Sequence, residues 1–179
     1  TMAGSIAGAH DAISAMAGLH VVAETVVAVH HCLLGPPSTT FEQVTSVLCH
    51  PVALAQCKQF FAENPQLEVH PSYDTAGAAM DVSKIADPAF AAVASRRAAL
   101  HYALKVLRAD IEDRADNQTR FLALSRAPQP LPDGTPARTM VMVTTGDAPG
   151  SLLTVLTPLA THGVSIRRLE SRPTGEPWS

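Results

Sequence analysis

The sequence has few aromatic residues and no run of apolar residues long enough to cross a lipid bilayer. Aromatic residues make up 4% and charged residues 16% of the 179 positions, whereas hydrophobic residues make up 46%. A membrane-spanning helix needs about 20 consecutive apolar residues, and the first residues show no basic segment of the kind that opens a secretory signal. The composition therefore predicts a globular protein with a sizeable core, which we expect to be cytoplasmic.

Basic residues are missing from the first 57 positions of the sequence. This stretch carries only three acidic groups, Asp11, Glu24 and Glu42, and the first basic residue is Lys58. The net charge of the chain is −3, which argues against a nucleic acid or an anionic membrane as a partner. An anionic ligand would be held by arginines of the later part, or by backbone N–H groups at helix starts in the early part.

Cysteine is scarce: Cys32, Cys49 and Cys57 are odd in number and show no C-x-x-C spacing. Reduced thiols are the natural interpretation. The residues that could suggest a zinc site are His30, His31, Cys32, Cys49 and His50. Adjacent side chains on an extended strand point to opposite faces, so one site could use His30 or His31 but not both. We therefore expect no metal.

Extended and helical patterns alternate over the first two thirds of the chain, which is typical of a parallel α/β sheet. The expected helices span residues 5–18, 51–64, 75–86 and 96–107. Pro51 suits the first position of the second helix, and Asp74 suits the N-cap of the third. The expected strands span residues 19–35, in two pieces that break near Glu24, and then 44–50, 67–73, 90–95 and 119–125.

A segment with four prolines in eleven residues, over 127–137, predicts a domain linker. Beyond it we expect a strand over 138–146, a helix over 149–163 and a strand over 164–173. This β-α-β pattern is typical of the start of a second, small domain. Three elements cannot bury the faces of a sheet and of a helix, so we expect this part to need a partner or to belong to a longer protein.

Three helix starts follow turns or apolar segments and could hold an anion. They lie at Ser5, at residues 49–51 and at residues 74–77. A helix N-terminus offers unpaired N–H donors and the positive end of the helix dipole, which suit carboxylates and phosphates. Ordinary capping is the alternative at each start, and only the convergence of several starts on one cleft would make a site.

Thr119 and Arg120 stand at the entry of the strand expected over 119–125. The Thr119 hydroxyl could donate to a ligand oxygen, and the Arg120 guanidinium could hold a carboxylate through two hydrogen bonds. Side chains at consecutive strand positions diverge, so the two cannot face one ligand atom. The alternative is that Arg120 pairs with Asp113 or Asp116.

Seven motifs occur in an order and spacing shared with a known family. They are AGSIAG, VVAETVVAVHHCLL, CHPVALAQC, YDTAGAA, AVASRRAALHYAL, IEDRADNQTRFLAL and ESRP. Together they resemble the prephenate dehydratases, which dehydrate and decarboxylate prephenate to phenylpyruvate in phenylalanine biosynthesis. Plant-type relatives act in the same way on arogenate, and YDTAGAA looks like that group.

The resemblance implies an α/β fold with a two-lobed catalytic domain, similar to periplasmic binding proteins, that residues 1–126 form in part. The linker over 127–137 would lead to part of an ACT domain, a ferredoxin-like α+β regulatory domain, over 138–179. The family's glycine-rich first strand and a further βαβ unit do not precede Thr1, so we expect a fragment of a longer chain or a truncated relative. A homodimer or homotetramer is expected, because ACT segments pair to bury sheet edges.

The resemblance also implies the residues of the site. Thr119 takes the position of the catalytic threonine, where its hydroxyl would polarise the C–OH bond that breaks. The residues implied in binding prephenate or arogenate are Ser5, His50, Gln56, Thr75, Asn117, Arg120 and Phe121. The residues implied in binding phenylalanine as an effector are Gly150, Leu152, Glu170, Ser171, Arg172 and Pro173. No metal or organic cofactor is implied, because aromatisation of the ring drives the reaction.

Ala3 and Gly4 stand before Ser5 where the family has Glu-Asn, and this departure leaves a second hypothesis open. The chain could be a ligand-binding remnant of the same fold, which binds an aromatic acid or an amino acid without turnover. The motifs around Thr119 and ESRP favour the dehydratase. Within the family, an arogenate dehydratase is the alternative to a prephenate dehydratase.

Overall fold

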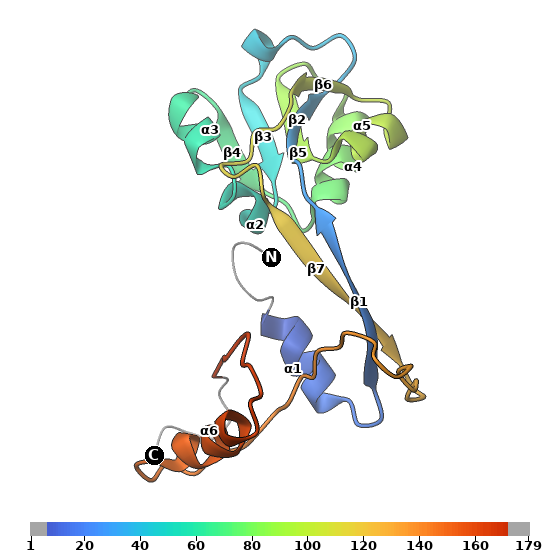
Figure 1. Cartoon of the computed structure of the whole chain (residues 1–179). Helices are drawn as coiled ribbons and strands as arrows, with labels where there is room; N and C mark the ends of the chain where they lie inside the picture. The colour runs from blue at the N-terminus through green and yellow to red at the C-terminus, as the bar shows by residue number, and fades with distance from the viewer. Residues whose placement is uncertain (1–6, 172–179) are drawn as a thin grey trace. The chain divides into compact units, whose positions relative to one another are not determined.

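The structure is a computed structural model and describes residues 7–171 (Figure 1). It divides into two units, Thr1–Pro130 and Leu131–Ser179, and their boundary falls inside the proline-rich segment. Three residues expected in a site, Ser5, Arg172 and Pro173, lie outside the described residues. Over the described part of the chain, no helix has the length and apolar character needed to cross a membrane.

The main sheet of the first unit has five strands in the order β4-β3-β5-β2-β6. The strands are β2 (Cys32–Gly35), β3 (Ser46–Cys49), β4 (Glu68–Pro71), β5 (Phe90–Ala94) and β6 (Lys105–Arg108). β3 is parallel to β4 and to β5, whereas β2 is antiparallel to both its neighbours, β5 and β6. The expectation of a parallel sheet is therefore wrong for β2, which is entered from another strand and not through a helical crossover.

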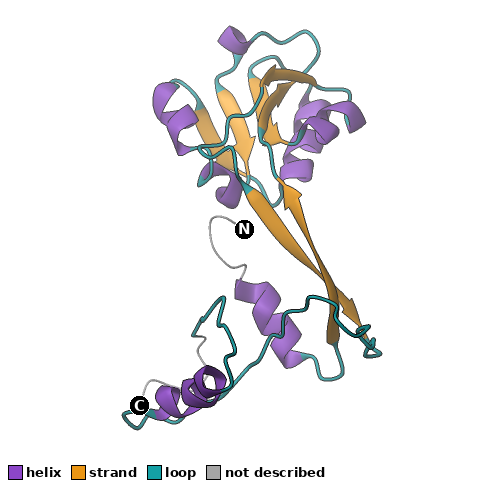
Figure 2. Ribbon diagram, in the orientation of Figure 1, coloured by secondary structure: helices purple, strands orange, loops and turns teal. Residues whose placement is uncertain are grey.

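Helices cover both faces of this sheet (Figure 2). The helices are α2 (Pro51–Leu54), α3 (Lys58–Glu63), α4 (Thr75–Ile85) and α5 (Arg96–His101). Alternate residues of a strand serve opposite faces: Leu33 packs in the cluster that contains residues of α2 and α3, and Leu34 packs in the cluster that contains residues of α4 and α5. The second cluster is rich in alanine, which lets the helices lie close to the sheet.

Two expected helices are wrong in part. The helix over 51–64 is divided into α2 and α3, because Asp113, far along the chain, accepts hydrogen bonds from the N–H groups of Lys58 and Gln59 and caps a new helix there. The helix over 96–107 ends at His101, and Ala103 turns the chain with a φ of 53°. Its last residues form β6 instead, because they pair with β2. The helix over 75–86 is confirmed, with Asp74 as its N-cap.

A two-stranded antiparallel sheet, called here the ribbon, joins β1 (His20–Ala28) to β7 (Gln118–Ser125). Figure 1 shows both strands running away from the main sheet. The break expected near Glu24 is wrong: β1 continues to Ala28 with a register shift between Val21 and Ala23, and the chain then crosses to β2 through residues 29–31. Helix α1 (Ala7–Ala15) precedes β1, within the helix expected over 5–18.

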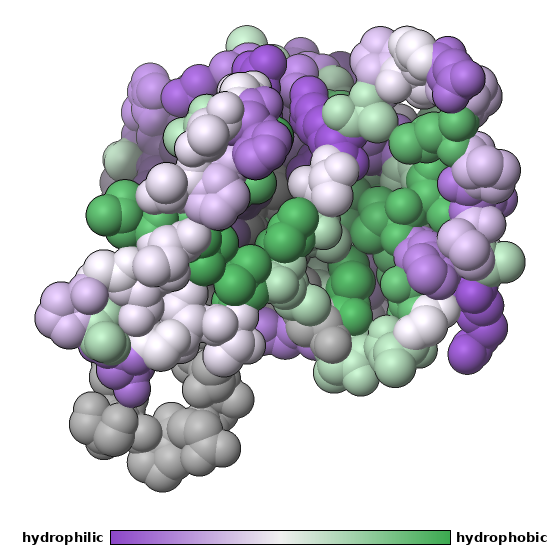
Figure 3. Space-filling model, turned by 60° about the horizontal axis from the view of Figure 1, so that its bottom comes forward, coloured by the Kyte–Doolittle hydropathy of each residue, from purple (hydrophilic) through white to green (hydrophobic). Residues whose placement is uncertain are grey.

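The ribbon exposes apolar side chains that its pairing does not bury. Val26 and Phe121 are 53% and 54% exposed. Two strands alone cannot shield both faces of a sheet from water. Figure 3 shows apolar side chains, in green, between polar ones on the face it draws.

The second unit contains helix α6 (Ser151–Thr161), which confirms the helix expected over 149–163. Gly150 precedes it with a φ of 89°. The strands expected over 138–146 and 164–173 are wrong as far as the described residues extend, since none of them forms a strand there. An apolar, β-branched run becomes a strand only where a neighbouring strand pairs with it, so the pattern alone does not decide these segments.

Replacement of Gly35 by alanine tests the packing of the sheet. Gly35 is buried in β2, and a Cβ atom there would lie 2.8 Å from Cδ1 of Leu107 and 3.2 Å from Cγ2 of Thr39. We expect Gly35→Ala to lower the free energy of unfolding by about 1–3 kcal/mol, measured by urea denaturation. Gly8→Ala is the control, because a Cβ there meets nothing within 4 Å. Equal urea midpoints for Gly35→Ala and the unmodified protein would contradict the packing described.

Candidate functional site

Two backbone segments, residues 29–31 and residues 109–117, cross between the ribbon and the main sheet. Asn117 lies directly before β7 and ties these two crossings together. Its Nδ2 donates to the carbonyl oxygen of Val29 and to Oε1 of Gln56, each at 3.2 Å. Its carbonyl oxygen accepts from the Val29 N–H at 2.9 Å. The residue is 2% exposed, and its Oδ1 has no hydrogen-bond partner among the described residues. A buried acceptor of this kind is rare and calls for a donor from a ligand or a water molecule.

His31, in the crossing formed by residues 29–31, is hydrogen-bonded to Gln56. Nε2 of His31 lies 2.7 Å from Oε1 of Gln56, the same oxygen that accepts from Asn117. The side-chain oxygen of Gln56 can only accept, so Nε2 of His31 carries the hydrogen. The main chain of His31 is held as well, because its carbonyl oxygen accepts from the N–H of Ile111 at 3.0 Å.

Glu112 supplies a buried negative charge beside these groups. One carboxylate oxygen accepts from the N–H of His31 at 2.8 Å, and the other lies 2.7 Å from Nδ1 of His30. Its side chain is 3% exposed. Burial raises the pKa of Glu112, but the hydrogen bonds from the N–H groups of His31 and Glu112 and from the His30 ring outweigh burial, so this pKa is lowered from 4.5. We call residues 29–31, Gln56, 111–113 and Asn117 together the junction.

Thr119 follows the junction after one residue. It is half-buried in β7, opposite Val27 of β1. Arg120 and Phe121 come next and are exposed, so the strand turns the expected catalytic hydroxyl and the expected cation to opposite faces.

Arg120 pairs across the ribbon with Glu24, whose Oε2 accepts from the arginine Nε at 2.7 Å. The alternative pairing of Arg120 with Asp113 or Asp116 is therefore wrong. Asp113 caps α3, and Asp116 pairs with Arg114 at 2.8 Å. The Arg120 guanidinium is thus a cation already shared with a carboxylate.

His50 and Thr75 begin helices after neighbouring parallel strands. His50 follows β3 and caps α2, its Nδ1 accepting from the Val52 N–H at 3.2 Å. Thr75 is the half-buried first residue of α4, shortly after β4. The N–H of Ser72, just after β4, donates to the carbonyl oxygen of Cys49 at 3.1 Å and ties the two strand ends together. The carboxyl ends of parallel strands are where α/β proteins bind ligands.

The residues expected to bind phenylalanine lie in the second unit of the chain, whereas the groups described above lie in the first. Gly150 and Leu152 stand at the start of α6, where Leu152 is exposed. Glu170 accepts from Nε of Arg168 at 3.2 Å, and Ser171 is exposed outside any helix or strand.

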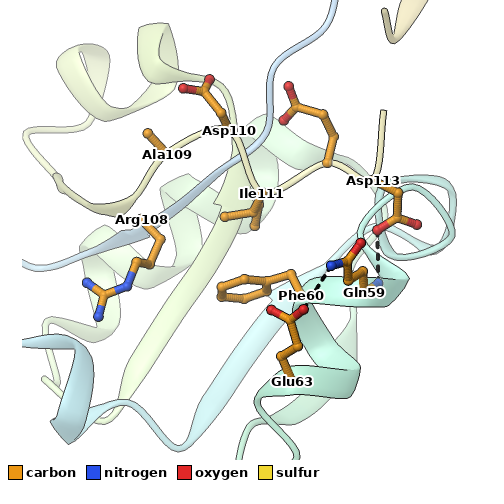
Figure 4. Close-up of a pocket in the computed structure, with 9 residues that line it drawn as sticks. Gln59, Phe60, Glu63, Arg108, Ala109, Asp110, Ile111 and Asp113 are labelled. Atoms are coloured by element: carbon orange, nitrogen blue, oxygen red, sulfur yellow. Dashed lines mark hydrogen bonds between the residues drawn. The ribbon is translucent and has the colours of Figure 1, made fainter. Parts of the chain in front are cut away.

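A surface pocket of about 300 Å³ is lined in part by residues 111–113 of the junction (Figure 4). Its lining residues are Gln59, Phe60, Glu63, Arg108, Ala109, Asp110, Ile111, Glu112 and Asp113. Four carboxylates against one guanidinium make it unsuitable for an anionic substrate, and it contains none of the expected site residues. It is not the candidate site.

His30, Asp110 and Glu112 bring one ligand atom each to within 4.8 Å of one another, a spacing that could hold a metal ion. Both oxygens of Glu112 already accept hydrogen bonds, from His30 and from the N–H of His31. We therefore interpret the group as a hydrogen-bonded cluster. The rings of His30 and His31 have different partners, as their adjacent positions predict.

Sequence reasoning identified Gln56 and Asn117, which the structure joins directly, and missed His31 and Glu112. In the sequence, His31 stands out only as a possible zinc ligand, and Glu112 only as a member of the motif IEDRADNQTRFLAL. No local pattern reveals them, because their roles arise where residues about 80 positions apart meet.

The fold and the junction define an α/β protein with polar residues gathered where its two sheets connect. The family model for prephenate dehydratase matches residues 1–129. A "Bifunctional N-acyl-homoserine lactone acylase/prephenate dehydratase" of Komagataeibacter europaeus is 39% identical over 175 residues, which cover 96% of this chain and 60% of that protein. An "Arogenate dehydratase/prephenate dehydratase 1, chloroplastic" of Arabidopsis thaliana is 37% identical over 155 residues, 87% of this chain and 39% of the relative.

Among solved structures, the prephenate dehydratase of Arthrobacter aurescens in complex with L-Phe is similar, with a TM-score of 0.82 and 31% identity. The match covers 97% of this chain and 57% of that one. The chain belongs to the prephenate dehydratase family. It spans about 39% to 60% of the length of the relatives named here.

Replacement of Glu112 by glutamine tests the charge in the junction. Because the folded-state pKa of Glu112 lies below its ordinary value, the carboxylate stabilises the fold above that value, and this stabilisation is lost as the pH falls through the lowered pKa. We expect Glu112→Gln to lower the free energy of unfolding at neutral pH by about 1–3 kcal/mol. The stability of the variant should also fall less steeply between about pH 5 and pH 3.

Urea denaturation across this pH range provides the measurement. Glu68→Gln is the matched control, because the Glu68 side chain is 76% exposed and should contribute little to the same pH dependence. Parallel pH profiles for Glu112→Gln and the unmodified protein would contradict the assigned hydrogen bonds.

Proposed function

We propose that the protein is a prephenate dehydratase, which converts prephenate to phenylpyruvate, water and carbon dioxide. The observation that carries this proposal is the hydrogen-bonded pair of half-buried Gln56 and buried Asn117, with an unpartnered acceptor at Asn117, two residues before Thr119. Membership of the family supports the same reaction. The substrate would lie between the junction and the helix starts at His50 and Thr75.

Prephenate carries two carboxylates and a hydroxyl that leaves from the ring carbon opposite the departing carboxylate. The Thr119 hydroxyl would donate a hydrogen bond to the leaving oxygen and withdraw electrons from the C–OH bond. As this bond breaks, the electrons of the C–CO₂⁻ bond move into the ring, which becomes aromatic. The leaving hydroxide takes up a proton to become water, and since an aliphatic hydroxyl is a weak acid, a relay would have to deliver that proton through Thr119.

The carboxylates require donors in a site from which water is excluded. The Asp74 carboxylate caps α4 and accepts from the N–H of Gly77, so a substrate carboxylate would be held by the first N–H groups of this helix, and a neighbouring oxygen by the Nε2 amide of Gln56. Arg120 would contribute only after exchanging Glu24 for a substrate carboxylate, because the two are paired in the ribbon. Phe121 is expected to pack against a neighbouring segment rather than react.

Arogenate, in which an amino group replaces the keto oxygen of the side chain, is the alternative substrate, and the Arabidopsis relative carries both activities in its name. We further propose that the first unit is part of a two-lobed catalytic domain. In this proposal the second unit is part of an ACT domain that assembles into homodimers or homotetramers and binds phenylalanine. The L-Phe complex of the Arthrobacter enzyme supports the effector.

Acyl-homoserine lactone hydrolysis is a second candidate, because the Komagataeibacter relative carries that activity in its name. The cysteines do not suit the role of nucleophile: all three are buried, and burial raises the pKa of Cys49 to about 12. In this candidate, a hydroxyl such as that of Thr119 would provide the attacking oxygen. Release of homoserine lactone by the purified protein would support this candidate.

Replacement of Thr119 tests the dehydratase. We expect Thr119→Ala to lower kcat for phenylpyruvate formation by about 10²- to 10³-fold, because a hydrogen bond to the leaving oxygen is lost, whereas Thr119→Ser should keep most activity. Thr25→Ala is the matched control, an exposed hydroxyl on the partner strand of the same ribbon. Unchanged kcat in Thr119→Ala, or no turnover by the full-length protein, would end the proposal.

Titration with L-phenylalanine tests the regulatory proposal by calorimetry. Gly150 holds a φ of 89° at the start of α6, a conformation that valine strongly disfavours. We expect Gly150→Val to weaken binding at least about tenfold, because the helix start must rearrange. Gly134→Val introduces the same strain at a φ of 76° in the proline-rich segment and should leave binding unchanged. Equal affinity in both variants would place the effector elsewhere.

A further inference from the structure

We propose that His31 is a positioning residue, which fixes the orientation of the Gln56 side-chain amide. This inference rests on the proposed function for its kinetic consequence, but not for its structural content. His31 is 5% exposed and lies in the crossing between β1 and β2, whereas Gln56 lies between α2 and α3.

An amide side chain can turn by 180° and exchange its oxygen with its nitrogen at little cost unless its neighbours prevent this. Here two donors converge on one oxygen. Asn117 donates to Oε1 of Gln56 with an amide group whose nitrogen also donates to the carbonyl oxygen of Val29, so that Asn117 cannot turn without losing both bonds. His31 donates to the same oxygen from Nε2, at the shorter distance of 2.7 Å.

The His31 ring can serve in this way because its main chain is fixed. The N–H of His31 donates to the buried carboxylate of Glu112, and its carbonyl oxygen accepts from Ile111. The main chain of Gln56 is held too, its carbonyl oxygen accepting from the N–H of Asp113 at 2.7 Å. With both backbones anchored to residues 111–113, the ring and the amide meet in one arrangement.

The fixed amide of Gln56 offers two N–H donors in one orientation. With its oxygen occupied twice, Gln56 presents the two hydrogens of Nε2, and among the described residues no acceptor takes them. Gln56 is half-buried, so this group keeps access to a ligand. A carboxylate oxygen of the substrate is the acceptor that fits two neutral donors in a partly dry site.

The experiment compares His31→Leu, which has no donor, with His31→Gln, whose Nε2 can replace the ring nitrogen. In the full-length protein, we expect His31→Leu to raise KM for prephenate about tenfold, the size expected for one hydrogen bond, with kcat within about twofold. His31→Gln should return KM to within about threefold of the unmodified value. His101→Leu, at the exposed end of α5, is the control.

A purely structural role for His31 would reduce the amount of active protein and lower kcat with KM unchanged, and that result would overturn the inference. So would an unchanged KM together with an unchanged kcat. Failure of His31→Gln to restore KM would overturn it as well.

Nuclear magnetic resonance separates failure of this inference from failure of the proposed function. If the unmodified protein converts no prephenate, the proposed function fails, and the position of the His31 proton still decides the inference. We expect the ring to carry hydrogen on Nε2, and the side-chain amide signals of Gln56 to shift in His31→Leu and to return in His31→Gln. A bare Nε2, or Gln56 signals that do not move, would overturn the inference whatever the activity.

Discussion

The hydrogen bonds of the junction are the constraint on which the candidate site depends. Two backbone segments cross between the main sheet and the ribbon, and four hydrogen bonds tie them: Val29 to Asn117 in both directions, Ile111 to His31, and His31 to Glu112. Separation of the two crossings would leave the buried Glu112 carboxylate and the buried Asn117 amide without these hydrogen bonds. Because such a loss costs free energy, the hydrogen bonds hold both crossings in place. Gln56, which lies between α2 and α3, is hydrogen-bonded to one residue of each crossing, His31 and Asn117.

The same junction determines the positions of the residues proposed to act on the substrate. β7 begins immediately after Asn117, so the position of Thr119 along the ribbon follows from the anchoring of Asn117. The helix starts at His50 and Thr75 follow β3 and β4, whose parallel pairing brings their carboxyl ends to one edge of the sheet. The strand that carries Thr119 and the edge that carries His50 and Thr75 are therefore each fixed by backbone hydrogen bonds, as the proposed catalysis by positioned donors requires.

Local patterns were sufficient for elements whose causes are local. The helix Thr75–Ile85 has its cap in Asp74, and the strand Phe90–Ala94 is an apolar run bounded by turns, so both could be predicted from sequence. The strand Lys105–Arg108 could not, because its residues also suit a helix and only pairing with β2 decides between the two. The division of the helix over 51–64 depends on Asp113, which sequence reasoning could not place there.

The candidate site follows the same rule. The motifs contain Thr119, Gln56 and Asn117 as expected site residues. The contacts of His31 with Glu112 and Gln56 join segments far apart in the sequence, so only the structure shows them. The pairing of Arg120 with Glu24 also needed the register of the ribbon, in which Glu24 faces Leu122 and Val26 faces Arg120. Motifs thus select the candidate residues, which stay predictions, and the tertiary hydrogen bonds show how they are held.

In the proposed site, the side-chain amides of Gln56 and Asn117 contact the ligand. The most direct measurement follows their amide resonances while phenylpyruvate, the product of the proposed reaction, is added to the full-length protein. We expect saturable shifts of both amide signals, at the same product concentrations that shift the signal of Thr119. Saturation with shifts confined to residues outside the junction and β7 would contradict the proposed site.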